Sequence, residues 1–285
     1  MCHPHPRVVL GLHRSRHERR TLTAALDLDV TTIDTSFNYH RFTAHETLTR
    51  VAGDLLPRLT ISTKVGFFPT GNGQAEHSLD PGRLLQALEK TNTDLGRPPD
   101  LVFLHNPERS LERHRDQAAE ALATACDALR EAATRGLCGA WGIASWDPSR
   151  LPELIDTTTP RPDVLMTRTG LTANSAMLDA AETLTAQWKP NARWGMSPFG
   201  GNTDDPVWQT FDPRIFLQGP SDDMSRLQAA FRLAYHLPPV TTVAVGTDNP
   251  THLRELLNAL PRKVDSTAIH QYRSLLRERA RHQPA

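Results

Sequence analysis

Residues 31–40 read TTIDTSFNYH, in which a short apolar segment ends in Asp34 and is followed five positions later by Tyr39. A carboxylate is an unusual end for a segment that otherwise resembles a buried strand. Two later segments end in a similar way, since ISTK ends in Lys64 and LVFLH ends in His105. A fold that gathers these strand ends in one place would explain all three.

Such a fold follows from the alternation of short apolar segments with amphipathic helical patterns. The clearest helical pattern covers Asp116–Arg135, with one apolar face and Gly136 as its stop. Eight strands, each followed by a helix, within about 250 residues predict an α/β fold, a single-domain (β/α)8 TIM barrel over residues 1–285. The rival is an open doubly wound sheet, but the first strand–helix turn, GLHRSRH, lacks the GxGxxG fingerprint. The predicted strands are Arg7–Gly11, Thr31–Thr35, Leu59–Lys64, Leu101–His105, Ala140–Ala144, Val164–Thr167, Arg193–Ser197 and Thr241–Val245.

Two connections are long for a compact domain. They are Val65–Pro81 after the third strand and Phe199–Asp222 after the seventh. Loops of this length are commonly lids or binding loops, and barrel enzymes place such loops at the carboxyl ends of the strands. Residues 1–6 and about 280–285 are expected to be flexible chain ends.

Composition and cysteine usage narrow the class of protein. A hydrophobic fraction of 38% supports a packed core, and a formal net charge of zero gives no reason to expect a nucleic-acid partner. No apolar run approaches the roughly 18 residues of a membrane span, and the first residues do not resemble a secretion signal. Cys2, Cys126 and Cys138 lack metal-type spacing, which indicates free thiols in a reducing cytoplasm. Cys2, His3 and His5 could hold a metal in principle, but a proline-punctuated chain end is a poor site, and no metal is predicted.

The ionisable strand ends make chemical sense as one site. Lys64 beside Asp34 would stay charged, and its ammonium would favour the phenolate of Tyr39 and lower a pKa that is about 10 in water. Such a tyrosine can give its proton to an oxygen that is becoming an alkoxide. His105 can orient the same oxygen or stabilise its developing charge. The set suits a carbonyl that receives hydride and a proton, and it equally suits proton transfer without any hydride.

The segments TTIDTSFNYH, ISTKVGFF, LVFLHNPE and AWGIASW resemble the aldo-keto reductase superfamily in order, spacing and strand placement. That family has DTAxxY after its second strand, lysine after the third, LHxP after the fourth and GxSN after the fifth. Glu46, in HETL, is similar to the acidic residue of a further family motif. The resemblance extends from about Pro6 to Leu260. It implies an NADPH-dependent carbonyl reductase with a complete catalytic tetrad in which Tyr39 is the general acid.

The nicotinamide side of the resemblance departs from the family pattern. In the family, a Ser-Asn pair and a glutamine hold the carboxamide, and these positions fall on Ala144, Ser145 and Met166. A thioether cannot make the hydrogen bonds of an amide. In GMSPFG, Met196 stands where the family often stacks an aromatic ring, and Ser197 follows it. All five positions are candidate cofactor contacts.

The phosphate end is also altered. The segment VAVGTDNPTHLRELLNAL resembles the family's segment for the adenosine phosphate, whose basic and asparagine positions fall on His252 and Leu256. Gly246, Thr247 and the backbone N–H groups that open the last helix are expected to form a phosphate site, with His252 as its basic side chain. Asp204 and its neighbour would place negative charge near a pyrophosphate.

Phe67, Phe68 and Trp146 lie just past strand ends and are expected to wall a substrate pocket. The expected partner is a small or medium-sized carbonyl compound, and the expected state is a monomer or weak homodimer.

Two other functions stay open. One is an enzyme that needs no cofactor and uses the tetrad for acid–base chemistry, as a dehydratase, isomerase or cyclase. The other is a non-catalytic barrel that senses a nucleotide.

Overall fold

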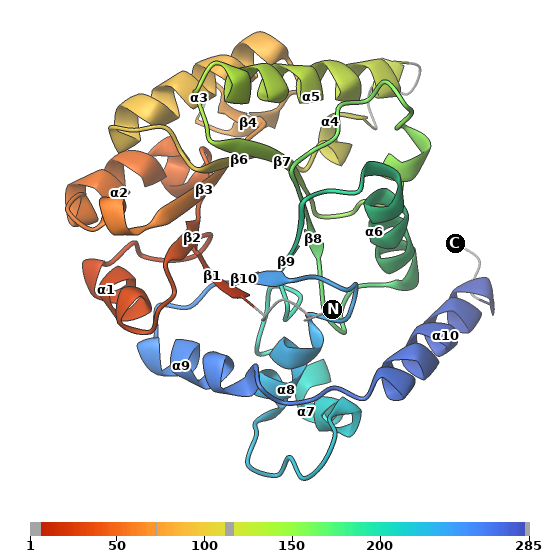
Figure 1. Cartoon of the computed structure of the whole chain (residues 1–285). Helices are drawn as coiled ribbons and strands as arrows, with labels where there is room; N and C mark the ends of the chain where they lie inside the picture. Colours follow the sequence, from red (N-terminus) through yellow and green to blue (C-terminus); the bar gives the residue numbers. More distant parts are fainter. Residues whose placement is uncertain (1–6, 72, 112–116, 283–285) are drawn as a thin grey trace.

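Eight parallel strands close into a barrel in the computed structural model, and helices surround it (Figure 1). The structure describes residues 7–71, 73–111 and 117–282. The predicted (β/α)8 barrel is confirmed, and each predicted strand differs from the observed one by at most one residue at either end. In barrel order the strands are β1 (Arg7–Gly11), β2 (Thr32–Asp34), β3 (Thr60–Val65), β6 (Leu101–His105), β7 (Ala140–Ser145), β8 (Val164–Arg168), β9 (Ala192–Met196) and β10 (Thr242–Val245), which pairs with β1.

The predicted repeat of strand and helix holds in seven of the eight units and fails in one. After β7 the chain forms only the short 3₁₀ helix η4 (Leu151–Glu153). The segment 146–163 contains four prolines, which remove backbone donors and interrupt helices. The helices of the ring are α1 (Arg19–Asp27), α2 (Ala44–Ala52), α3 (Pro81–Leu95), α5 (Ala118–Thr134), α6 (Ser175–Trp188), α8 (Arg226–Leu233) and α9 (Pro250–Ala259).

The shorter elements occupy the connections, and a last helix lies outside the ring. The short elements are η1 (Tyr39–Phe42), η2 (Leu56–Arg58), α4 (Glu108–Leu111), α7 (Val207–Thr210) and η5 (Pro213–Phe216). Helix α10 (Ser266–His282) contacts α6 on the outside of the barrel (Figure 1). Of the ends expected to be flexible, residues 1–6 and 283–285 lie outside the described residues, whereas His282 still belongs to α10. No helix in the described ranges is both long and apolar enough to cross a membrane.

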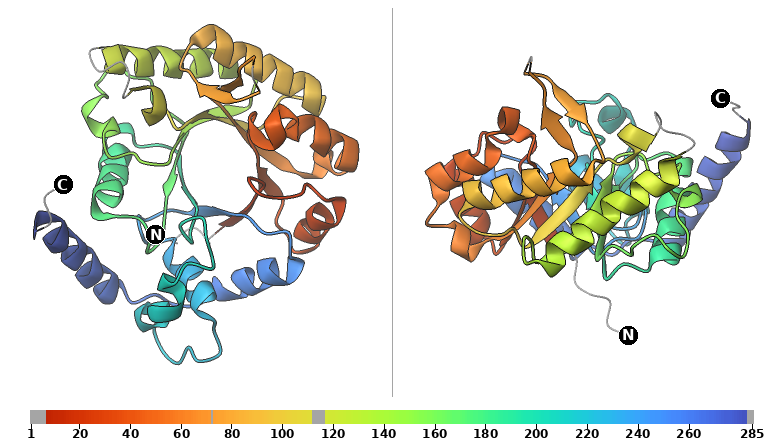
Figure 2. Two further views of the ribbon diagram at one scale, coloured as in Figure 1. Left: turned by 180° about the vertical axis from the view of Figure 1, so that it is seen from behind. Right: turned by 90° about the horizontal axis from the view of Figure 1, so that it is seen from above.

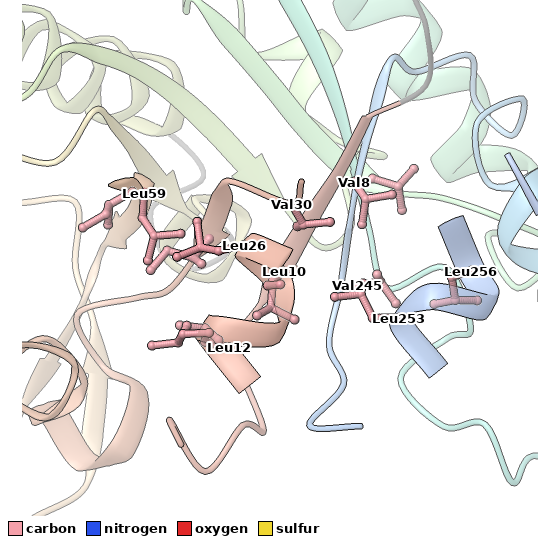
Figure 3. Packing of buried hydrophobic residues seen from close by; sticks show 14 of the residues in the cluster. Val8, Leu10, Leu12, Leu26, Val30, Leu59, Val245, Leu253 and Leu256 are labelled. Atoms are coloured by element: carbon pink, nitrogen blue, oxygen red, sulfur yellow. The ribbon is translucent and has the colours of Figure 1, made fainter. Parts of the chain in front are cut away.

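Alternation along each strand separates two sets of side chains. One set, including Val9, Phe103 and Met166, fills the barrel interior. The other set faces the helices. In β1, for example, Val8 and Leu10 pack in one cluster with residues of β10 and α9, including Val245, Leu253 and Leu256 (Figure 3). Leu256, at the family's asparagine position, is therefore part of the core.

The segment after β3 is not a plain loop. It contains the antiparallel hairpin of β4 (Phe67–Pro69) and β5 (Ala75–His77), which projects from one end of the barrel (Figure 2). Gly66 joins β3 to this hairpin with a φ of +141°, a conformation that side chains other than glycine rarely adopt. The hairpin places Phe67 and His77 beside the end of β6.

The cysteines of the described chain are structural. Cys126 on α5 is fully buried, and Cys138 before β7 belongs to the same apolar cluster. Both are free thiols. Cys2, with its neighbours His3 and His5, lies outside the described residues.

Candidate active site

Three strand ends and the start of η1, at Tyr39, place the four predicted catalytic residues around one side of the barrel mouth. Asp34, Lys64 and His105 are buried at the ends of β2, β3 and β6. Their neighbours Ile33 and Leu104 pack in the clusters that face the helices. Because consecutive strand residues point to opposite faces, the three ionisable side chains point into the barrel.

Lys64 connects this group. Its ammonium forms an ion pair with Asp34, donates to the carbonyl of Thr35 at 2.9 Å and reaches the hydroxyl of Tyr39 at 3.5 Å. Asp34 also accepts a hydrogen bond from Ser62 at 2.8 Å. Burial lowers the pKa of Lys64, but the charge of Asp34 and then Tyr39 outweigh it and leave the pKa raised. Lys64 therefore stays cationic at neutral pH, although its side chain is only 2% exposed.

The expected direction of the Tyr39 pKa is wrong for the free protein. Burial raises the pKa of Tyr39, and this effect outweighs the opposing effect of Lys64. The sequence indicated the cation but could not indicate how deeply the phenol would be covered. Tyr39 is consequently a phenol at neutral pH and carries a proton that it can donate.

His105 is held as a neutral imidazole. Burial, followed by the charge of Lys64, lowers its pKa well below 6.5. The hydroxyl of Ser36 lies 3.1 Å from Nδ1, and the same hydroxyl donates to the Asn38 amide oxygen at 2.6 Å. His77 Nε2 lies 2.7 Å from the carbonyl oxygen of His105. The sequence analysis did not single out Ser36, although the serine of DTS stands where the family motif has alanine.

The predicted pocket aromatics have different environments. The ring of Phe67 lies between those of His77 and His105, with centroid separations of 4.8 and 4.9 Å. Trp146 is 39% exposed and lines a cleft at the barrel mouth. Phe68 is instead buried in the core beneath Arg83, so it does not wall a pocket at the mouth.

The cleft has a volume of about 470 Å³ and lies between the loops that follow β1, β9 and β10. Asp34, Met196 and Ala244 line it at the barrel end. Ser197 lines it as well, and its buried hydroxyl has no hydrogen-bond partner among the described residues. The cleft also includes Gly11, His13, Arg14, Ser15, Trp146, Pro198, Phe199, Gly201, Asn202, Thr203, Asp204, Val245, Gly246, Thr247 and Asp248.

His13 is a further ionisable residue beside Tyr39, and the sequence analysis did not select it. It lies in the loop after β1, and its ring meets the ring of Tyr39 edge to face with centroids 4.9 Å apart. Burial, Arg14 and Lys64 all lower its pKa, in that order of size. No group of three or more His, Cys, Asp or Glu side chains in the described chain is arranged to hold a metal ion.

Comparison with known proteins places this geometry in a family. The model of the aldo/keto reductase family matches residues 13–180, more than half of the chain. The chain belongs to that family. Membership implies an oxidoreductase, and the aldo-keto reductase resemblance of the sequence is confirmed.

Solved aldo-keto reductases have the same fold. One from Bacillus halodurans, in its holo form, gives a TM-score of 0.71 at 16% identity, covering 96% of each chain. A putative aldo-keto reductase from Pseudomonas aeruginosa gives 0.64 at 21% identity, covering 89% of this chain and 90% of that one. At these identities the likeness shows the fold alone. No curated protein matches the sequence.

Within this aldo/keto reductase, the positions expected to hold a nicotinamide carboxamide are turned away or covered. Ala144 and Met166 are fully buried in the barrel interior. Ser145 is also fully buried, and its hydroxyl donates to Glu108 at 3.0 Å. Glu108 lies 37 positions earlier, so the sequence alone did not show that it would occupy Ser145.

A short strap joins the loop after β1 to the loop after β10. Ser15 donates to the carboxylate of Asp248 at 2.6 Å, and the backbone N–H of Arg16 donates to its other oxygen at 3.0 Å. Beyond this strap lies a depression of about 610 Å³ lined by Arg16, Arg20, Thr247, Asp248, Asn249, Pro250 and His252. His252 is exposed on α9 there. Arg16 and Arg20, from the first loop and helix, are basic residues that the sequence analysis missed at this end.

Proposed function

We propose that this protein reduces a small or medium-sized carbonyl compound with NADPH, and that Tyr39 is the general acid. The observation that carries the proposal is the buried Lys64, which joins Asp34 to the hydroxyl of Tyr39 at the barrel mouth. Burying a charge is costly even when it is paired, so a buried ammonium that reaches a phenol favours a catalytic role over a purely structural one.

The chain's own residues divide the acid–base work. Tyr39 holds a proton at neutral pH and donates it to the carbonyl oxygen as negative charge develops there. Lys64 stabilises the phenolate that remains, at a site where burial alone would disfavour it. Asp34 keeps Lys64 charged and fixed. Neutral His105 orients the carbonyl oxygen.

The cleft supports a dinucleotide at its phosphate end. The unpartnered hydroxyl of Ser197 is a donor of the kind that binds phosphate groups. At the start of α9, Pro250 has no N–H and that of Thr251 donates to the side chain of Asn249 at 2.9 Å, so the backbone N–H of His252 is the donor proposed there. Met196, Gly246, Thr247 and His252 are proposed as the further contacts along the path. When bound there, NADPH supplies the hydride that reaches the carbonyl carbon.

A binding titration followed by a kinetic comparison tests this proposal. Tryptophan quenching should report saturable micromolar binding of NADPH, with NADH titrated separately. A panel of aldehydes and ketones should then consume NADPH, and Tyr39→Phe should lower kcat by about 10²- to 10⁴-fold while leaving the NADPH dissociation constant unchanged. Absence of binding by either nucleotide at millimolar concentration would sink the proposal. Binding without turnover of any carbonyl would favour a nucleotide-sensing barrel.

One observation favours a second candidate, cofactor-independent acid–base catalysis by the same tetrad. Ser145 is engaged by Glu108, and Met166 offers no amide, so the family's carboxamide contacts are not reproduced. This candidate predicts that Tyr39→Phe abolishes a dehydration, isomerisation or cyclisation. It also predicts that added nicotinamide nucleotide leaves the rate of that reaction unchanged.

A further inference from the structure

Arg168 ends β8 on the side of the mouth opposite to Asp34. In the closed order of eight strands, β8 lies four strands from β2 (Figure 1). Val164 and Met166, at alternate positions of β8, belong to the cluster that fills the barrel interior. Arg168 continues this alternation at the next position, so its side chain leaves the strand on the side of the barrel mouth.

The guanidinium of Arg168 has no carboxylate in contact with it among the described residues. No carboxylate of the described residues lies within 4 Å of its guanidinium, and its buried Nε has no hydrogen-bond partner. Among the described residues, its other nitrogens meet the carbonyl oxygen of Thr172 at 3.4 Å and the sulfur of Met177 at 3.9 Å. Burial lowers the pKa of this half-buried guanidinium, and the distant charge of Asp147 opposes that only in part.

The contrast with Arg273 shows what this protein does with a buried arginine elsewhere. Arg273 on α10 is 8% exposed in its side chain and is paired with both Asp179 and Glu182 of α6. Buried guanidinium groups are costly without such partners. The partly buried Arg232 also lacks a carboxylate partner among the described residues, but it donates to the carbonyl of Arg262 at 2.7 Å. Arg168 has no comparably short bond to a described residue, and it stacks on Trp146, which lines the cleft.

The guanidinium of Arg168 stacks on the indole ring of Trp146. The guanidinium carbon lies 4.6 Å from the centre of the indole ring, a cation–π arrangement. Trp146 is positioned through its backbone N–H, which donates to the partly buried Glu108 at 2.8 Å. The same indole lines the 470 Å³ cleft. A guanidinium stacked in this way keeps its edge available for hydrogen bonds to a planar anion.

We propose that Arg168 binds a carboxylate of the substrate, so that this enzyme prefers aldehydes or ketones that carry a carboxylate over neutral ones. The inference rests on the proposed reductase function and adds the substrate class. The carbonyl group is held at Tyr39 and His105, and the carboxylate is held across the mouth at Arg168. A single guanidinium matches the single charge and the two oxygens of a carboxylate.

The test compares 4-carboxybenzaldehyde with methyl 4-formylbenzoate, which has similar size and electronic character but no charge. The wild-type protein should have the higher kcat/KM for the acid. Arg168→Met should lower kcat/KM for the acid about 10- to 100-fold, mainly through KM, because hydrogen bonds to a charged group are lost. The ester should change less than about twofold. Arg168→Lys keeps the charge but loses the planar guanidinium, so its kcat/KM for the acid should lie between those of the wild type and Arg168→Met.

Arg150→Met is the matched control. Arg150 is exposed and lies four positions after Trp146, so this variant removes the same charge near the mouth without touching the cleft. It should leave the preference for the acid intact. Benzoate binding, measured by calorimetry, gives a readout without turnover, and Arg168→Met should weaken it by a similar factor.

The outcomes separate the two proposals. If neither aldehyde is reduced while benzoate binding depends on Arg168, the reductase function fails and the anion site stands. If both aldehydes are reduced equally well by the wild type, the substrate class is wrong. Equal losses for acid and ester in Arg168→Met, or a rise only in the KM for NADPH, would overturn the role of Arg168 in substrate binding.

Discussion

At the scale of single residues, the site depends on groups that hold its catalytic side chains in place. His105 is neutral, so it acts through the direction of its ring rather than through charge. Ser36 is the side chain that contacts its Nδ1, at 3.1 Å. A hydrogen bond of this kind contributes about 1 kcal/mol, enough to matter for orientation.

Ser36→Ala should lower kcat about fivefold, which corresponds to the loss of one hydrogen bond of about 1 kcal/mol. The dissociation constant for NADPH should not change, because Ser36 does not line the cleft proposed for the cofactor. Steady-state kinetics and the nucleotide titration measure the two quantities. Ser36→Thr keeps the hydroxyl and should retain most of the rate. A variant with wild-type kcat would show that Ser36 does not position His105.

The ion pair of Lys64 and Asp34 allows stability to be separated from catalysis. Lys64→Met should lower the free energy of unfolding by about 3–5 kcal/mol, because it leaves the Asp34 carboxylate buried without its partner. The double variant Asp34→Asn with Lys64→Met should regain most of that stability and stay inactive. Urea denaturation and the carbonyl assay measure both. Recovery of activity in the double variant would contradict the role given to Lys64.

At the scale of elements, the loop after β1 is tied to the loops after β9 and β10. Ser15 and Arg16 are tied to Asp248 after β10, and Arg14 donates to the carbonyl of Gly201 after β9 at 2.7 Å. Three loops that are distant in sequence are thus joined over one cleft. Asp248 also lines both the cleft and the outer depression. Its negative charge lies beside the proposed route of the phosphate groups.

Asp248→Asn should tighten NADPH binding about fivefold. The substitution removes a like charge from the proposed phosphate path, worth about 1 kcal/mol in a partly solvated site. The amide oxygen can still accept the bond from Ser15, whereas the bond from the backbone N–H of Arg16 to the second oxygen is lost. Tryptophan quenching measures the change. Increasing salt should reduce the difference between variant and wild type, because exposed charges are screened. Weaker binding by the variant would contradict this location of the phosphates.

The helices and strands were easier to predict than the surroundings of individual side chains. The strands follow from local apolar segments, and the helix of Ala118–Thr134 follows from its periodic face and Gly136. The hairpin after β3 has no comparable apolar pattern, and the prolines after β7 were not weighed against the repeat. The pKa of Tyr39 depends on how much of the chain covers it, and the hydroxyl of Ser145 is bonded to Glu108 of α4. Such effects come from side chains that approach only in the folded barrel.

At the scale of the whole molecule, buried neutral histidines connect stability to pH. Burial lowers the pKa of His17 and of His45 from 6.5 to about 4, and neighbouring His40 adds to the effect on His17. Both side chains are almost completely covered. The unfolded chain therefore binds more protons than the folded chain between pH 6.5 and about 4.

The free energy of unfolding should accordingly be fully retained above pH 6.5 and fall as the pH drops toward 4. Each of the two histidines contributes about 3 kcal/mol to this loss. Urea denaturation at several pH values measures it. His45→Gln can still bond to Thr63 but cannot titrate, so its loss over the same range should be smaller by about 3 kcal/mol. An unchanged pH profile in this variant would contradict the assignment.

The reactivity of the two thiols in the core can measure the rate at which the barrel opens locally. Cys126 and Cys138 are covered by the same cluster, and burial raises the pKa of Cys138 to about 12, so neither reacts while the fold is closed. In a protein with Cys2 replaced by serine, alkylation by a maleimide should therefore proceed only at the rate at which α5 and β7 separate. The two native thiols therefore report local unfolding, and the effect of a bound ligand on the rate of that unfolding can be measured without introducing a new cysteine.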